Sequence, residues 1–193
     1  MFKSRKIPAS CSDEELMRML QSEALHGALD ELYQRYSVAL LRYFYRMMWK
    51  DKERAQDMLH DLFVKVIENK QSFDINRSFK TWIYSIGYNM CKNEYRRFQL
   101  RKSVDGILAI TNLADTDSDV RLDDDQFKQR LNLLLETLSD EDQSLFALRY
   151  ENELPFHEIA MILGMPEGSA KSRLFYLKKK LAEKLAGYKV INR

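Results

Sequence analysis

Residues 156–185 read FHEIAMILGMPEGSAKSRLFYLKKKLAEKL, and this stretch is the most informative part of the chain. A short apolar run ends at Gly164, a residue type that often terminates helices, and residues 165–167 form a turn around a proline. Apolar residues then recur at helical spacing from about Gly168 to Leu185, interleaved with lysines. A short helix, a tight turn and a longer basic helix together predict a helix-turn-helix, whose second helix can enter the major groove of DNA.

The final helix offers two kinds of contact to such a partner. Near its start, Ser169 and Ser172 can meet phosphates, and Arg173 can donate a bidentate pair to guanine. Lysines farther along would add attraction without reading sequence; they are Lys178, Lys179 and Lys180. The alternative is an amphipathic surface helix whose lysines are only solvated.

Charge is segregated around this motif. Residues 136–167 hold eight acidic residues against Arg149 alone, whereas residues 168–193 hold eight basic residues against Glu183 alone. The basic end can steer a polyanion. Because the formal net charge of the chain is only +2, tight DNA binding would need a further partner.

The rest of the chain is also predicted to be helical, because Gly and Pro are scarce. Capping residues predict helix starts at Ser12, Asp51, Ser78 and Ser139. We expect helices from Ser12, over 24–48, 51–69, 78–101, 126–138, 139–152, 156–163 and 168–185, with a polar loop at 70–77. The predicted fold is all-α, with two helical domains, a helical bundle and a helix-turn-helix domain, joined by an acidic linker.

The expected domain boundaries follow composition. Residues 1–24 are an N-terminal segment with a short helix, and 25–102 form the bundle. Residues 103–125 form the linker, since six aspartates fall within residues 115–125. Residues 126–193 form the second domain.

Several function classes are disfavoured. Cys11 and Cys91 are isolated, which indicates reduced thiols rather than a disulfide or zinc set. No signal peptide or apolar run of membrane-spanning length is present, so we expect a cytoplasmic protein without membrane insertion. Asp57, His60 and Asp61 share a helix face, but no matched ligands accompany them elsewhere, so we expect no metal, no cofactor and no enzyme.

Three stretches resemble the extracytoplasmic-function sigma factors of bacterial RNA polymerase. The C-terminal one runs from Leu138 to Leu174 and ends in GSAKSRL, where the family usually carries GTVKSRL. Residues 57–63 (DMLHDLF) resemble the family's polymerase-binding helix. Residues 79–97 (FKTWIYSIGYNMCKNEYRR) resemble its promoter-melting region. The resemblance spans about residues 25–185 in the family's order, which is more specific than a lone helix-turn-helix.

The resemblance implies partners and site residues. Core RNA polymerase would be bound at its largest-subunit clamp helices and its flap, the clamp through Asp57, His60, Asp61 and Lys65. The minus-ten promoter element would be bound by Phe73, Asp74, Asn76, Arg77, Ser78, Lys80, Asn89, Asn93, Arg96 and Arg97. The minus-thirty-five element would be bound by Ser169, Lys171, Ser172, Arg173, Tyr176, Lys178, Lys179 and Lys180. An anti-sigma factor is a further expected partner.

Three positions depart from the family pattern. His60 and Asp61 stand where Gln-Glu is common, Asn93 replaces a usual Asp, and Tyr176 replaces a common Arg. The implied role is to direct promoter recognition, DNA melting and transcription initiation. The alternative is a free-standing helix-turn-helix regulator that binds operators as a dimer, which explains residues 126–185 but not the pattern in residues 50–100.

Overall fold

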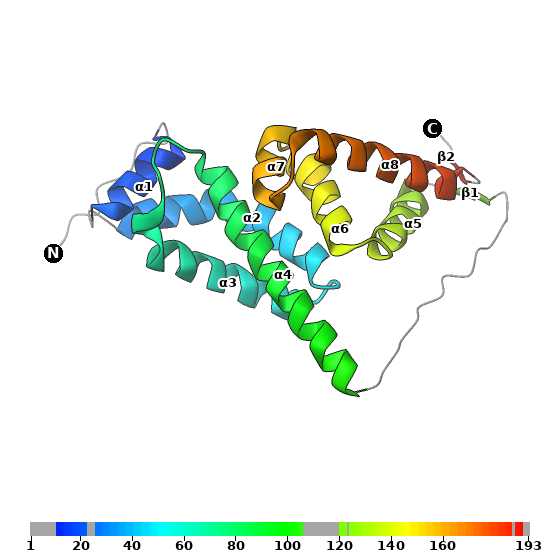
Figure 1. Cartoon of the computed structure of the whole chain (residues 1–193), viewed down its shortest axis with the longest axis horizontal. Coiled ribbons are helices and arrows are strands. Elements are labelled where there is room, and N and C mark those ends of the chain that lie inside the picture. Colours follow the sequence, from blue (N-terminus) through cyan, green and yellow to red (C-terminus); the bar gives the residue numbers. More distant parts are fainter. Residues whose placement is uncertain (1–10, 23–25, 106–119, 123, 187, 191–193) are drawn as a thin grey trace.

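The computed structural model describes residues 11–22, 26–105, 120–122, 124–186 and 188–190 (Figure 1). Its helices are α1 (Asp13–Gln21), α2 (His26–Met47), α3 (Lys52–Glu68), η1 (Lys70–Ser72), α4 (Phe79–Asp105), α5 (Asp124–Glu136), α6 (Asp140–Phe146), η2 (Ala147–Glu151), α7 (Phe156–Leu163) and α8 (Glu167–Leu185). The predicted all-α class is confirmed. One small addition was not expected: β1 (Val120–Leu122) pairs in parallel with β2 (Tyr188–Val190).

The predicted capping residues begin their helices as expected. Ser12 and Glu15 form a reciprocal capping box at α1. The Asp51 and Ser139 side chains accept hydrogen bonds from the backbone amides three residues on, at the starts of α3 and α6. The Ser78 hydroxyl accepts from the Thr81 amide at 3.2 Å in the first turn of α4.

The helices α1 to α4 form the first bundle. α2 packs against α1, α3 and α4, and its inward side chains from Leu32 to Met47 are buried. Gly87 of α4 lets that helix approach α2 closely, because an added Cβ would lie only 3.3 Å from the Phe44 ring. α4 continues to Asp105, beyond the predicted end near residue 101.

The helices α5 to α8 form the second bundle. The predicted helix over 139–152 is present but changes type: α6 ends at Phe146, and residues 147–151 continue it as a π-helical turn. Gly164 ends α7 with a φ of 67°, the left-handed conformation that glycine adopts without strain. α8 then presents Ala170, Leu174, Leu177 and Leu181 to the bundle, on the inner stripe that the spacing predicted.

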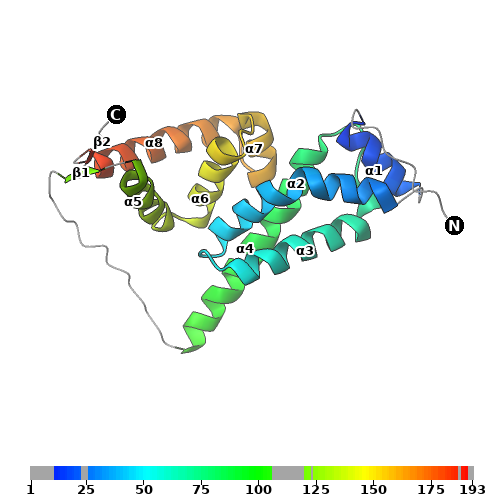
Figure 2. The ribbon, with the colours of Figure 1, turned by 180° about the vertical axis from the view of Figure 1, so that it is seen from behind.

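The two bundles pack against each other, an arrangement that sequence left open. Ser144 is fully buried between them and lies 3.2 Å from the Tyr43 hydroxyl. Lys50 pairs with Glu136 at 2.5 Å, and Arg46 pairs with Glu151. Figures 1 and 2 accordingly show α6 and α7 beside α2 and the first half of α4. The division at residues 103–125 stays a prediction, since residues 106–119 and 123 lie outside the described part. Across the described helices, none combines the length and the apolar character that crossing a bilayer requires.

Candidate nucleic-acid interface

The loop between η1 and α4 exposes polar side chains. Asp74, Asn76 and Arg77 are exposed, and the Asp74 Oδ1 accepts from the Asn76 backbone amide at 3.0 Å and from its side-chain amide at 3.1 Å. The backbone hydrogen bond from Asn76 lowers the pKa of Asp74 below its ordinary value. Arg77 lies 3.5 Å from the same carboxylate. The loop is therefore an ordered turn that presents an amide and a guanidinium to solvent.

One predicted loop residue does not belong to this exposed set. Phe73 is only 4% exposed, and its ring packs 5.1 Å from Trp82 and 5.8 Å from Phe79. An apolar ring at this depth holds the loop onto α4 and does not face solvent. We therefore withdraw Phe73 as a DNA contact. Trp82 is likewise partly buried against the core.

An exposed row runs along α4. Asn89, Asn93, Arg96 and Arg97 are all exposed and follow one another at helical steps. Arg97 lies 3.7 Å from Glu94, and 71% of its side chain is nevertheless exposed. Tyr88, beside this row, is buried, and burial raises its pKa. Amides and guanidinium groups in one row can donate hydrogen bonds to a phosphate backbone and to bases.

Lys80 is engaged in the present arrangement. Its Nζ donates to the Asn152 carbonyl oxygen at 3.2 Å, across the boundary between the bundles. The Ser78 hydroxyl accepts a hydrogen bond from the Thr81 amide and so caps α4. These two predicted contacts are thus tied to the protein, whereas Asp74, Asn76 and Arg77 of the preceding loop are exposed.

The outer face of α8 carries exposed polar and aromatic side chains. Ser169, Lys171, Ser172, Lys178, Lys179 and Lys180 are exposed, as predicted. Tyr176 is 68% exposed, and Phe175 beside it is 65% exposed, with the two rings 5.5 Å apart. Phe175 was missed, although its place one step outside the Ala170–Leu174–Leu177 stripe was a usable signal. Two exposed aromatic rings on a basic helix give it an apolar contact surface for bases.

Arg173 has a different place from the predicted one. Its Nε donates to Asp142 and its Nη1 to Glu141, both at 2.5 Å, and its Nη2 lies 3.2 Å from the Ser139 hydroxyl. The hydrogen bond that Arg173 donates to Asp142 is the main cause of its raised pKa. The guanidinium therefore joins α8 to the start of α6, so we no longer assign Arg173 to base reading.

The α3 helix presents the other predicted surface. Asp57, His60, Asp61 and Lys65 are all exposed, and Val64 and Ile67 beside them are 39% and 43% exposed. These two aliphatic side chains were not predicted. Charged groups around exposed apolar ones are typical of a protein-binding patch. Within the described residues, no group of three His, Cys, Asp or Glu side chains is placed to hold a metal ion.

Both bundles match known protein families. Residues 32–101 match Sigma-70 region 2, and residues 128–181 match Sigma-70 region 4. The RNA polymerase sigma factor YlaC of Bacillus subtilis is 30% identical over 146 residues, which cover 71% of this chain and 80% of YlaC. The chain belongs to the extracytoplasmic-function sigma factors.

Further relatives agree with this family assignment. The ECF RNA polymerase sigma factor SigW of Bacillus subtilis is 29% identical over 148 residues, covering 72% of this chain and 79% of SigW. The structure of CnrH in complex with the cytosolic domain of CnrY has the same fold, with a TM-score of 0.67 and 21% identity over 90% of this chain and 97% of that one. The sigma factor RpoE of Bartonella quintana, crystallised with the anti-sigma factor NepR, gives a TM-score of 0.62 with 23% identity over 81% of this chain and 97% of that one. Sigma factors are transcription initiation factors that act in promoter recognition.

The two matched segments contain every candidate surface. The α3 patch, the loop after η1 and the α4 row lie in region 2. The outer face of α8 lies in region 4. The α1 helix lies before the first residue that matches region 2, so the family match gives no information on how α1 packs.

Proposed function

We propose that this sigma factor uses three separate surfaces to bring core RNA polymerase to promoters. The observation that carries the proposal is the pair of exposed polar rows, one on α4 and one on α8, in the two matched regions. One chain with two nucleic-acid surfaces on separate bundles can contact two DNA elements at once. A dimeric operator-binding regulator would need only the second.

The α3 patch binds the clamp helices of the largest polymerase subunit. Asp57, Asp61, His60 and Lys65 supply charge complementarity, and Val64 and Ile67 supply apolar contact area. The flap of the polymerase is the expected partner of the second bundle.

The loop after η1 and the α4 row bind the minus-ten element. Asn76 and Arg77 project from the ordered turn, where they can meet an unstacked base. Asn89, Asn93, Arg96 and Arg97 follow the strand, and Asp74 orders the turn through its contacts to Asn76. Ser78 contributes by capping the start of α4.

The outer face of α8 reads the minus-thirty-five element. Lys171 and Ser172 contact DNA near the helix start, and Phe175 and Tyr176 offer apolar contact to thymine methyl groups. Ser169 and the three lysines at 178–180 contact phosphates. The common Arg of the family is replaced here by Tyr176, which predicts a different base preference at that position.

The two bundles must separate for this function. Lys80 and Tyr84 of α4 both contact Asn152 of the second bundle, so the start of α4 is covered. Lys80 becomes available to DNA when this contact opens. Polymerase, which holds the two regions apart on two DNA elements, supplies the binding energy for opening.

Further expectations belong to the same proposal. The protein acts in the cytoplasm by binding and not as an enzyme, and it needs no cofactor. An anti-sigma factor is proposed as a regulator, since the two structures of similar fold are of CnrH with CnrY and of RpoE with the anti-sigma factor NepR.

Reconstitution with core polymerase tests the proposal. Core enzyme with and without the protein is footprinted on a promoter mapped in the native cell. The proposal expects protection at both elements and melting at the downstream one only when both components are present. Protection of a single site by the protein alone would favour the dimeric regulator.

A further inference from the structure

The α1 helix is attached to both ends of the loop that we assign to the minus-ten element. At the start of the loop, the Gln21 side-chain amide donates to the Lys70 carbonyl at 2.9 Å and to the Phe73 carbonyl at 2.8 Å. The Gln71 side-chain amide donates a hydrogen bond to the Gln21 backbone carbonyl at 2.9 Å. The last turn of α1 therefore fixes the backbone of η1.

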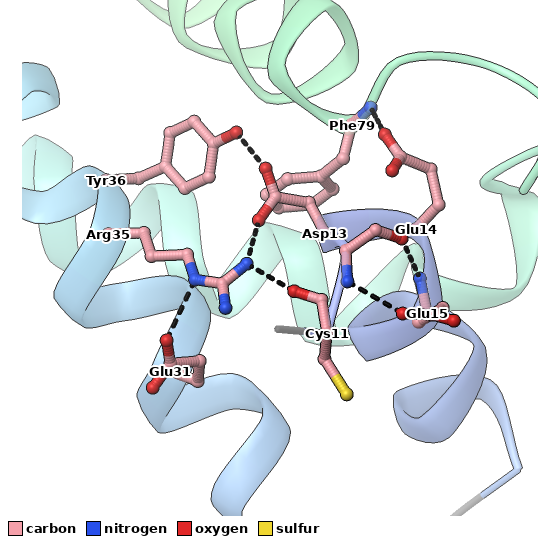
Figure 3. Close-up of polar contacts among 9 residues, drawn as sticks. Cys11, Asp13, Glu14, Glu15, Glu31, Arg35, Tyr36 and Phe79 are labelled. Carbon is pink, nitrogen blue, oxygen red and sulfur yellow. Dashed lines mark hydrogen bonds and ion pairs between the residues drawn. The ribbon is translucent and has the colours of Figure 1, made fainter. Parts of the chain in front are cut away.

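At the other end of the loop, Glu14 supplies a second cap to α4. The Phe79 backbone amide donates to the Glu14 Oε1 at 3.0 Å (Figure 3). This amide is among the first of α4 and has no partner within its own helix. A carboxylate at this position also interacts favourably with the positive end of the helix dipole. Ser78 caps the next turn from within the loop, so α4 has a local cap and a distant one.

α1 is itself firmly attached to α2, so that it can hold the loop in place. Asp13 accepts hydrogen bonds from the Tyr36 hydroxyl and from Arg35 Nη1, the latter at 2.7 Å (Figure 3). Arg35 also donates to the Cys11 carbonyl at 2.9 Å and to Glu31 at 2.8 Å. Leu16 and Met17 of α1 are fully buried, and Leu20 nearly so. The loop is thus connected through α1 to α2 and to the core of the bundle.

We infer that α1 is the element that positions the minus-ten loop, with Glu14 and Gln21 as its positioning residues. The inference rests on the proposed function of residues 74–77. Neither side chain reaches the outer face of the loop; each holds backbone groups. Ordering the loop before DNA arrives lowers the entropy cost of capturing a base. Glu14 and Gln21 therefore act on promoter capture without touching DNA.

Hydrogen exchange of the free, full-length protein tests the positioning step. Glu14→Ala and Gln21→Ala should speed exchange of amides in residues 70–79, while amides of α3 stay protected. Glu14→Gln, which keeps an acceptor oxygen but loses the charge, should give an intermediate rate. Arg18→Ala is the matched control, because Arg18 is exposed on the same helix. Unchanged exchange in residues 70–79 for both alanine variants would overturn the inference.

Binding of holoenzyme to a single-stranded oligonucleotide with the non-template minus-ten sequence tests the functional step. Glu14→Ala and Gln21→Ala should each weaken binding by about 2- to 30-fold, the range expected for loss of one side-chain cap. Core polymerase assembly should be unaffected, and Arg18→Ala should bind normally. Faster loop exchange combined with normal oligonucleotide binding would also overturn the inference.

Loop variants separate this inference from the proposal beneath it. Asn76→Ala and Arg77→Ala remove the exposed side chains themselves and leave α1 intact. If both bind the oligonucleotide as well as the unchanged protein, the assignment of the loop to the minus-ten element fails, and the role of α1 falls with it. If they lose binding and the α1 variants do not, only the role of α1 is wrong.

Discussion

The Tyr84 hydroxyl donates to the Asn152 side-chain oxygen at 2.6 Å, and this bond joins α4 of the first bundle to the turn after η2 of the second. Asn152 is fixed in turn by its own amide, which donates to the Ala147 carbonyl at 2.9 Å. Its backbone oxygen accepts from Lys80 at 3.2 Å. One asparagine therefore holds two side chains from the start of the proposed melting helix.

Removing the Tyr84 hydroxyl should loosen the contact between the bundles. In Tyr84→Phe, the ring keeps its packing against Tyr43, at 5.8 Å, but Asn152 loses a hydrogen-bond donor. We expect the free energy of unfolding to fall by about 1 kcal/mol and the radius of gyration of the free protein to rise. Urea titration and small-angle scattering measure these quantities. Tyr33→Phe, on an exposed tyrosine, is the control. Equal stability of the two variants would show that the bond contributes little.

Arg173 should act on stability and not on base preference. Arg173→Ala leaves Glu141 and Asp142 without their shared partner, and we expect a loss of about 1 kcal/mol, since the guanidinium is partly exposed. Arg173→Lys should restore only part of it, because an ammonium cannot make the same paired contact. Holoenzyme binding to promoter variants should weaken uniformly. A loss of affinity that depends on one or two base pairs only would show that Arg173 reads bases.

Tyr176 and Phe175 should instead alter the base preference at the upstream element. Each ring is more than half exposed on the outer face of α8, so truncation removes contact area without opening the core. We expect each alanine variant to cost about 1–3 kcal/mol on the preferred sequence and less on others. Neutralising Lys179 should weaken all sequences alike and lower the salt dependence by about one unit at most. Binding of holoenzyme across a salt series distinguishes the two patterns.

The buried tyrosines predict unfolding at alkaline pH. Burial raises the pKa of Tyr36, Tyr43, Tyr84 and Tyr95, because the interior disfavours the phenolate. Their contribution to stability is complete below the ordinary tyrosine pKa of about 10 and declines as the pH rises above it, since only the unfolded chain ionises freely there. Circular dichroism and phenolate absorbance should therefore change together. Full ionisation of all ten tyrosines in a folded protein would contradict this.

Local chemistry explains what the sequence could predict. The caps at Ser12, Asp51, Ser78 and Ser139 act over about one helical turn, so a short pattern contains all the information they need. The inner stripe of α8 follows from helical periodicity in the same way. The exposed α4 row, in contrast, was implied by the resemblance to the family and not by spacing.

Contacts between distant segments explain what the sequence could not predict. Phe73 sits in a polar stretch, and only the folded structure shows its ring packed on Phe79 and Trp82. Arg173 lies among basic residues, but its partners Asp142 and Glu141 are 31 and 32 positions away. The attachment of the loop to Glu14 spans 65 positions. Spacing within one helix has no information on such pairs.

Charge reversal on α3 should disrupt polymerase assembly. In a double Asp57→Lys, Asp61→Lys variant, the proposed clamp surface changes sign while both side chains remain exposed, so helical content should not change. We expect at least a tenfold loss of affinity for core polymerase, which corresponds to about 1.4 kcal/mol or more. Glu183→Lys, an exposed acid of α8, is the control. Normal assembly of the double variant would show that the clamp binds another surface of the protein.

Transcription from promoter DNA by core polymerase tests whether the protein directs transcription initiation. Core enzyme is incubated with fragmented DNA of the native genome, with and without the full-length protein, and transcript starts are mapped. This function predicts discrete starts that require the protein and share two upstream elements, and their loss with the Asp57→Lys, Asp61→Lys variant. Starts that do not depend on the protein, or a protein that binds palindromic sites and never associates with core polymerase, would contradict it.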